Sequence, residues 1–221
     1  MVSLGAGVKV ATQRVSMMGV SIVARMTALA LSDGSTLVHS PIALDDQALA
    51  SLGHVSFVVG PNKFHHLFIS QVVERATSAS LWVTEGLARK RGDLKVSGMF
   101  GRDPWPLAGE VEAVLVEGIP ALDEVVLFHH ASKTLVVADT LMNIHARSFG
   151  QRLYARLSDV LERPNVPRLA RMMLRDKGAA RRSVERILDL TPSRLVLAHG
   201  QVVERISSSE LRAAFGPLLG D

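Results

Sequence analysis

Apolar positions along this chain follow two spacings. Short runs of β-branched and leucine residues are typical of strands, and longer stretches with apolar residues three and four apart are typical of helices. The short runs predict strands over residues 7–11, 19–31, 36–39, 55–59, 80–84, 111–116, 124–128, 134–138 and 194–198. The helical spacing predicts helices over 44–52, 66–78 and 207–215, and a broken helical region over 149–190.

Turn and breaker residues separate these elements. Asp33-Gly34 predicts a hairpin between the second and third strands. Residues 91–109 collect glycine, aspartate and proline and predict a long loop, and residues 129–133 predict an exposed hairpin loop. Gly178 is expected to interrupt the helical region, and Ser208 or Ser209 to cap the last helix. Strands that alternate with helices and end in helices predict one layered α/β domain over residues 1–221, with helices outside.

Composition fits a well-packed domain with few aromatic residues. The 221 residues are 48% hydrophobic but only 5% aromatic, so the core must be built from Val, Leu, Ile, Ala and Met. The apolar run over 15–24 imitates a signal peptide. Because Arg25 interrupts it and a hairpin explains the same residues, we expect a cytoplasmic protein. No apolar stretch has the length of a membrane span, which predicts no membrane partner.

The charge balance is basic, with a formal net charge of +4 and a sequence pI near 9.8. Arginines and lysines crowd residues 168–186 and 89–91. We interpret these segments as solvated helical faces, because neither contains aromatic residues that would stack on bases. A small-molecule substrate is therefore favoured over nucleic acid, and the sequence leaves a homo-oligomer open. The chain has no cysteine, which excludes disulfides and thiolate ligands.

Candidate metal ligands stand at the ends of three predicted strands. His65 and His66 follow the strand over 55–59, Asp139 follows 134–138, and His199 precedes a glycine after 194–198. Histidines and a carboxylate suit zinc, with iron or manganese as alternatives, and leave a position for water. Simpler interpretations stay open: the two histidines could start a helix, Asp139 could cap one, and His199 could be a core histidine.

Four further polar residues accompany these candidates. His39 ends a predicted strand and is expected to hydrogen bond behind the ligands rather than bind the ion. Asn62 is placed to fix the turn or to orient a ligand. Asn143 and His145 follow Asp139 closely enough to support the same site from behind.

Four short motifs carry a resemblance to a known family. They are His-Ser-Pro at 39–41, Pro-Asn-Lys-Phe-His-His at 61–66, Ala-Asp-Thr-Leu at 138–141 and Ala-His-Gly at 198–200. With these motifs the chain resembles the metallo-β-lactamase-like hydrolase superfamily, in a branch with a Pro-Asn-x-x-His-His turn. The resemblance runs from residue 26 to 215 and implies an αββα sandwich, two mixed sheets with helices on the outer faces.

The chain departs from the superfamily at one of two metal sites. The superfamily turn reads His-x-His-x-Asp-His. When its last histidine is aligned with His66, its aspartate falls on His65. Its first histidine then falls on Pro61 and its second on Lys63. A further histidine would fall near residues 118–120, where this chain has Gly-Ile-Pro. The resemblance therefore implies that the first site is lost.

The second site is implied to remain. It would be a single-metal centre of His65, His66, Asp139 and His199, in which His65 replaces the usual aspartate. Lys63 would place an ammonium where the first ion normally lies, to hold a substrate anion or to neutralise Asp139.

These residues predict a metal-dependent hydrolase with one divalent ion. A metal-bound hydroxide would attack an ester, lactone, amide or phosphoester. Asp139 would orient the water or accept its proton, and Lys63 would help to stabilise the charge that develops on the substrate oxygen. Two alternatives stay open. One is a catalytically silent family member that binds a small anion or a partner without metal, and the other is a nucleic-acid-processing protein.

Overall fold

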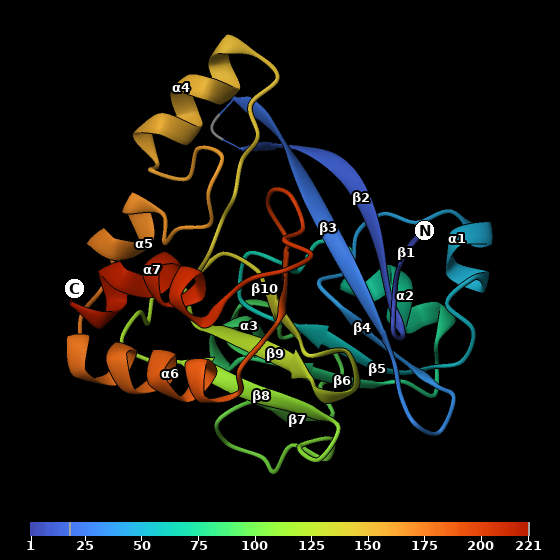
Figure 1. Ribbon diagram of the computed structural model, residues 1–221. Coiled ribbons are helices and arrows are strands. Elements are labelled where there is room, and N and C mark those ends of the chain that lie inside the picture. Colours follow the sequence, from blue (N-terminus) through green and yellow to red (C-terminus); the bar gives the residue numbers. More distant parts are fainter. Residues whose placement is uncertain (18, 221) are drawn as a thin grey trace.

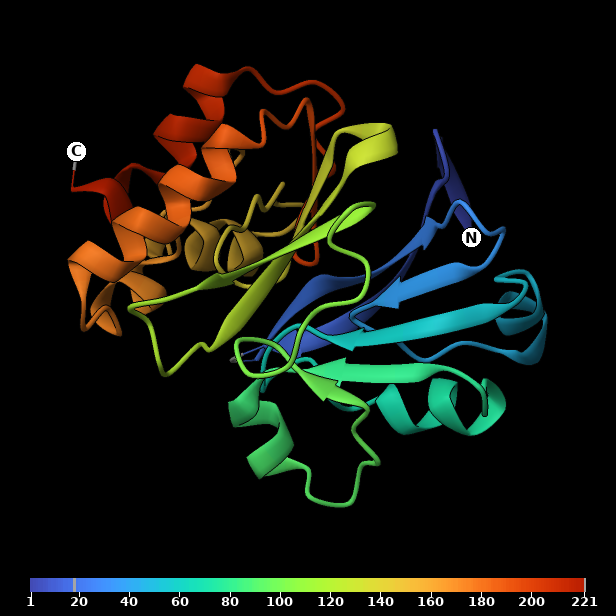
Figure 2. The same cartoon turned by 90° about the horizontal axis from the view of Figure 1, so that it is seen from below.

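Two β-sheets face each other and helices cover both outer faces, as Figures 1 and 2 show for a computed structural model of the chain. The structure describes residues 1–17 and 19–220. Met18, in the predicted apolar run, and Asp221, at the end of the predicted domain, lie outside the described residues. The predicted fold class, an αββα sandwich with two mixed sheets, is confirmed.

The first sheet has seven strands in sequence order, antiparallel from β1 to β4 and parallel from β4 to β7. Its strands are β1 Val2–Gly5, β2 Val8–Met17, β3 Val20–Ala30, β4 Thr36–His39, β5 Val55–Gly60, β6 Ser80–Val83 and β7 Gly98–Met99. The predicted hairpin joins β3 to β4. The Asp33 carboxylate accepts the Ser35 N–H at 2.8 Å and Gly34 takes a positive φ of 83°, as a tight turn requires.

The second sheet has four strands in the order β11-β10-β9-β8. Its strands are β8 Val111–Val116, β9 Glu124–His129, β10 Thr134–Val137 and β11 Arg194–Leu197. β10 and β11 run parallel, and the chain between them passes through three helices. Their carboxyl ends therefore lie side by side at one edge of the sandwich.

Helices flank the sheets on both sides. They are α1 Asp46–Ala50, α2 Ile69–Arg75, α3 Glu85–Lys90, α4 Phe149–Leu157, α5 Arg168–Met172, α6 Lys177–Asp189 and α7 Ser208–Leu219, with a 3-10 turn η1 at His130–Ser132. Helices α1 to α3 pack on the first sheet, and α6 and α7 pack on the second (Figure 2). None of the described helices has the length and apolar composition needed to cross a membrane.

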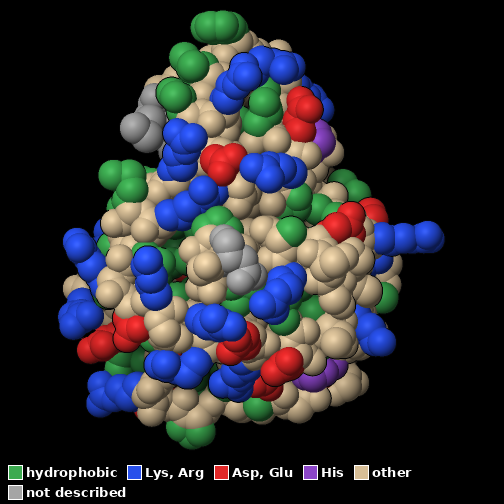
Figure 3. All heavy atoms as spheres, turned by 60° about the vertical axis from the view of Figure 1, so that its left-hand side comes forward, with side chains coloured by type: hydrophobic (Ala, Val, Ile, Leu, Met, Phe, Trp, Pro, Cys, Tyr) green, Lys and Arg blue, Asp and Glu red, His purple; other side chains and the backbone are tan. Residues whose placement is uncertain are grey.

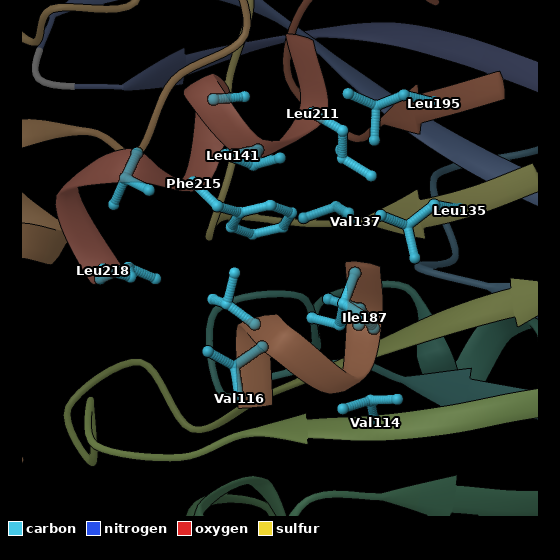
Figure 4. Packing of buried hydrophobic residues seen from close by; sticks show 14 of the residues in the cluster. Val114, Val116, Leu135, Val137, Leu141, Ile187, Leu195, Leu211, Phe215 and Leu218 are labelled. Carbon is cyan, nitrogen blue, oxygen red and sulfur yellow. The ribbon is translucent and has the colours of Figure 1, made fainter. Parts of the chain in front are cut away.

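Three layers of packing hold the sandwich together. One core lies between the first sheet and its helices, a second between the two sheets, and a third between the second sheet and α6 and α7. In the third, Phe215 of α7 is fully buried and lies among Val137 of β10 and Ile187 of α6 (Figure 4). Aliphatic side chains fill most of these layers, as the composition predicts.

Several expected boundaries are wrong for local reasons. The last helix is capped by Ser207, whose hydroxyl accepts the Glu210 N–H in a capping box, and not by Ser208 or Ser209. Gly178 does not interrupt α6, because it lies in the first turn behind the Asp176 cap. Residues 85–90 form α3, which the sequence did not predict. His129 is buried rather than exposed, and its Nδ1 lies 2.8 Å from the Ser132 hydroxyl.

The arginine-rich face of α4 to α7 carries acidic partners as well. Figure 3 shows Lys and Arg side chains spread over this face with Asp and Glu among them. Asp159 pairs with Arg163 and Arg171, and Arg181 pairs with Glu185 at 2.8 Å. These pairs fit the interpretation of solvated helical faces.

Candidate metal centre

Three strand ends bring His65, Asp139 and His199 together. His65 lies on the turn after β5, Asp139 two residues after β10 and His199 two residues after β11. The His65 and His199 Nε2 atoms each lie 3.2 Å from a different oxygen of the Asp139 carboxylate. One ligand atom from each residue lies within 4.8 Å of the others, which is the spacing of a metal site. The three side chains are almost inaccessible, at 9%, 8% and 4% exposure.

The contacts of His199 leave its Nε2 available as a ligand. Its Nδ1 lies 2.8 Å from the Val23 carbonyl oxygen. A carbonyl only accepts, so Nδ1 must carry a proton and Nε2 of the neutral ring carries the lone pair. That lone pair faces the Asp139 oxygen, which is unfavourable unless a proton or a cation lies between them. An imidazole fixed in this way by a carbonyl is typical of a metal ligand.

The surroundings of His199 also raise its pKa. Burial lowers this pKa, but the hydrogen bond and the negative charge of Asp139, together with the Val23 carbonyl, outweigh burial. The site therefore attracts positive charge, either a proton on His199 or a metal ion. Gly200 permits the arrangement: its φ is 124°, and a Cβ there would lie 1.9 Å from the Asn143 carbonyl oxygen. Glycine thus lets the two backbones touch, as the sequence indicates.

His65 is held from its other side as well. Its Nδ1 lies 2.6 Å from the Ser40 hydroxyl, and Ser40 follows directly on β4 with a positive φ of 55°. The His65 and His199 rings lie 5.1 Å apart between centroids and are inclined by 49°. Both imidazoles therefore present Nε2 to the same carboxylate while Nδ1 is hydrogen bonded behind them.

A buried amide and a second carboxylate position Asp139. Asn62 donates from Nδ2 to Asp139 at 2.8 Å and to Glu124 at 3.1 Å, and its Oδ1 accepts the Phe64 N–H at 2.8 Å. The Asn62 side chain thus fixes the turn and orients a ligand, the two roles that the sequence left open. Glu124, at the start of β9, accepts the backbone N–H groups of residues 138, 139 and 140 at 2.7 to 3.0 Å.

The two carboxyl groups have different electrostatic environments. Burial raises the pKa of Asp139, but the positive charge and the hydrogen bonds that His65 and His199 supply when protonated prevail and hold it well below its usual value. Burial and the neighbouring charge of Asp139 raise the pKa of Glu124 to about 7, against the opposing effect of its N–H donors. Asp139 is therefore the ionised ligand, and Glu124 supports it.

His66 does not join the cluster, although the sequence favoured it as a ligand. Its Nδ1 lies 3.3 Å from the Arg91 guanidinium, which also donates to the His66 carbonyl oxygen at 3.0 Å. Arginine stays protonated, so Nδ1 must accept and Nε2 of the neutral ring must carry the proton. Burial and the charges of Lys90 and Arg91 lower the pKa of His66, which keeps the ring neutral. In this arrangement His66 borders the same cavity without a free lone pair.

Lys63 lies away from the three ligands. Its ammonium donates to the Pro120 carbonyl oxygen at 3.3 Å, and Lys63 is not among the described residues that line the cavity beside the site. The Asn62 turn fixes the backbone so that His65, three residues after Asn62, faces Asp139 instead. The predicted supply of positive charge by Lys63 has no support in this geometry.

The remaining candidates divide into buried and exposed residues. His39 is buried with neither ring nitrogen hydrogen bonded to a described residue, so its predicted hydrogen bond behind the ligands is not formed. Asn143 is buried next to His199, and its N–H donates to the His199 carbonyl oxygen at 3.1 Å. His145 is exposed and does not line the cavity. Sequence patterns missed Glu124, because a carboxylate at the start of an apolar strand carries no motif.

Comparison with solved structures identifies the fold. A metallo-β-lactamase from Pontibacter korlensis matches with a TM-score of 0.63 at 13% identity, over 98% of this chain and 97% of the other. One from Hirschia baltica gives 0.62 at 11% identity, over 98% and 96%. One from Erythrobacter litoralis gives 0.63 at 13% identity, over 99% and 93%. Sequence comparison adds nothing: no protein-family model matches the chain, and no curated protein does.

The fold and the site together define a class. The chain is a metallo-β-lactamase-like αββα sandwich with a histidine–aspartate–histidine cluster at one edge. At such low identities the likeness establishes the fold alone, and the cluster is this chain's own variant of a site at strand ends.

Proposed function

We propose that this protein is a metal-dependent hydrolase that holds one divalent ion on His65, Asp139 and His199. The observation that carries the proposal is the fixed tautomer of His199, which directs a lone pair at a buried carboxylate. A metal ion at the common point would satisfy that lone pair, the facing oxygen of Asp139 and the His65 Nε2 together. Three protein ligands with an open fourth position are typical of catalytic zinc, and iron or manganese accept the same donors.

An ion bound by these residues would acidify a water molecule and polarise the oxygen of an ester, lactone, amide or phosphoester. The chain's own groups prepare the site for it. Asp139 is ionised, and its low pKa makes it a ligand rather than a general base. Asn62 and Glu124 hold the carboxylate in place, and Ser40 and the Val23 carbonyl hold the two imidazoles. We assign no step to Lys63.

Metal titration of matched variants tests the proposal. The purified protein is stripped with a chelator and titrated with Zn²⁺ and Co²⁺ by calorimetry and by the visible spectrum of Co²⁺. We expect one ion per chain for the unsubstituted protein and loss of that binding in His65→Ala and His199→Ala. His66→Ala is the matched control, because it removes the adjacent histidine of the same turn and should keep the stoichiometry of one.

Hydrolysis of neutral esters and lactones by the loaded protein then tests the activity. Metal binding without hydrolysis of any substrate class would contradict the hydrolase activity and leave the metal site standing. Absence of metal binding, or an equal loss in His66→Ala and His65→Ala, would contradict the assigned ligand set.

A further inference from the structure

A cavity of about 420 Å³ opens beside the candidate metal centre, within the size range of small-molecule sites. His65, Asp139 and His199 form part of its wall. Large apolar side chains from separate segments form much of the rest: Ile42, Phe64, Leu67, Leu122, Leu169 and Met173. The predicted ligands therefore face an apolar chamber and not an open polar surface.

The described residues that line this cavity include no lysine and no arginine. Two basic side chains that contact the turn carrying His65, or belong to it, are held by other groups. Lys63 donates to Pro120, and Arg91 forms a bidentate pair with Asp93 at 2.6 and 2.7 Å. Among the described lining residues, an anionic group of a substrate would find no cationic partner for the hydration that it loses, which is costly. The lining therefore selects against ligands with a second negative charge.

Three of the apolar lining residues also face solvent. Phe64 is 51% exposed, Leu67 is 69% exposed and Leu169 is 57% exposed. The first two lie on the turn that carries His65, and Leu169 lies on α5. Exposed apolar side chains at the mouth of a cavity mark a surface that a ligand covers. An apolar chain that leaves the metal centre through this mouth would cover all three.

We propose that the cavity takes a neutral carboxylic ester or lactone with an apolar chain on its acyl side. This inference rests on the proposed hydrolase function, because it places the carbonyl group at the metal centre. The chain lies along Phe64, Leu67 and Leu169. In the reaction the oxygen of water bonds to the acyl carbon and the ester C–O bond breaks. The leaving oxygen takes a proton from the water, which yields a carboxylic acid and an alcohol from an ester and a single hydroxy acid from a lactone.

Chain length and charge of the substrate test this assignment. The zinc-loaded protein is assayed with p-nitrophenyl acetate, butyrate, hexanoate and octanoate, and with the octanoate analogue that ends in a carboxylate. Burial of each methylene favours binding up to about fourfold, so kcat/KM should rise along the series by two- to fourfold per methylene. The carboxylate analogue should fall at least tenfold below octanoate.

Two substitutions on α5 form a matched pair. Leu169→Asn places an amide in the cavity wall and should reduce the ratio of kcat/KM for octanoate to kcat/KM for acetate about tenfold. Met172→Asn is the control, because Met172 is 77% exposed and is not among the described lining residues. It should leave both substrates unchanged.

A binding measurement separates this inference from the hydrolase function. Calorimetric titration of the chelated protein with 2-decanone and with decanoate uses no metal and no turnover. We expect the ketone to bind at least tenfold more tightly, and Leu169→Asn to weaken it. If the protein hydrolyses nothing but shows this preference, the hydrolase function fails and the ligand class stands. If acetate and octanoate are hydrolysed equally, or if decanoate binds as well as the ketone, the inference is overturned.

Discussion

The buried side chain of His39 should make the free energy of unfolding fall as the pH falls. The side chain lies at the end of β4 with 1% exposure, and neither ring nitrogen has a hydrogen-bond partner among the described residues. Burial, with a smaller effect of the His65 charge, lowers its pKa from 6.5 to about 3. The folded protein therefore keeps His39 neutral at any pH above about 3, whereas the unfolded chain binds a proton there below 6.5.

Because the unfolded state binds more protons in this window, the free energy of unfolding falls as the pH falls. Each pH unit below 6.5 costs about 1.4 kcal/mol, so the change from pH 7 to pH 5 removes about 2 kcal/mol through this residue. The loss stops near the folded pKa of about 3. Above pH 6.5 both states are neutral and His39 contributes no slope.

Urea unfolding of the chelated protein at pH 7 and pH 5 measures this effect against His39→Leu. The leucine loses no hydrogen bond, because the imidazole makes none with the described residues. The unsubstituted protein should lose about 2 kcal/mol more than His39→Leu between the two pH values. Other titrating groups, including His199, are present in both proteins and cancel. His145→Gln, at an exposed histidine, controls for the removal of one histidine and should keep the original difference. Equal pH slopes for His39→Leu and the unsubstituted protein would refute the reasoning.

Three substitutions test the packing and support of the site. Glu124→Gln turns one acceptor oxygen into a donor facing a backbone N–H, which should cost about 1–3 kcal/mol in urea unfolding and weaken zinc binding about 10- to 100-fold. Gly200→Ala forces a Cβ to within 1.9 Å of the Asn143 carbonyl oxygen at a φ of 124°, so its Tm should fall measurably; an unchanged Tm would contradict the close approach. Phe215→Ala should cost about 3–5 kcal/mol because Phe215 is fully buried, whereas Phe149→Ala, at 82% exposure, should stay within about 0.5 kcal/mol.

The sequence predicts the layers of the fold well because most strands leave a local signature. β5, β8, β10 and β11 are short apolar runs bounded by turn residues, and each has close to the predicted bounds. The long β2 was predicted only as far as residue 11. Its second half carries polar residues at Thr12 and Arg14, which are exposed because alternate positions of this half of the strand face solvent. The pairing of the strands into two sheets depends on contacts between distant segments, and only the family resemblance indicated it.

The sequence does not reveal which of the two adjacent histidines, His65 and His66, faces Asp139. Alignment with the superfamily turn made both residues ligands, with His66 at the final histidine of that motif and His65 in place of its aspartate. The choice between His65 and His66 depends on which ring the turn presents to Asp139, and that is decided by Asn62 and by Arg91, which lies 25 residues from His66. Neither contact can be read from sequence spacing. The three strand ends were therefore predictable, but the separation of His66 from the cluster was not.

The hydrogen bonds behind the three side chains show how the fold would hold the proposed metal centre. Asp139 owes its position to Asn62 and to backbone N–H groups that Glu124 collects, and each imidazole is held by a group on β3 or directly after β4. None of these supports comes from the positions at which the superfamily's first-site histidines would lie. The supports of Asp139, His65 and His199 therefore do not depend on a histidine at Pro61 or Lys63. They come from the strands of the sandwich and from the turns that follow them.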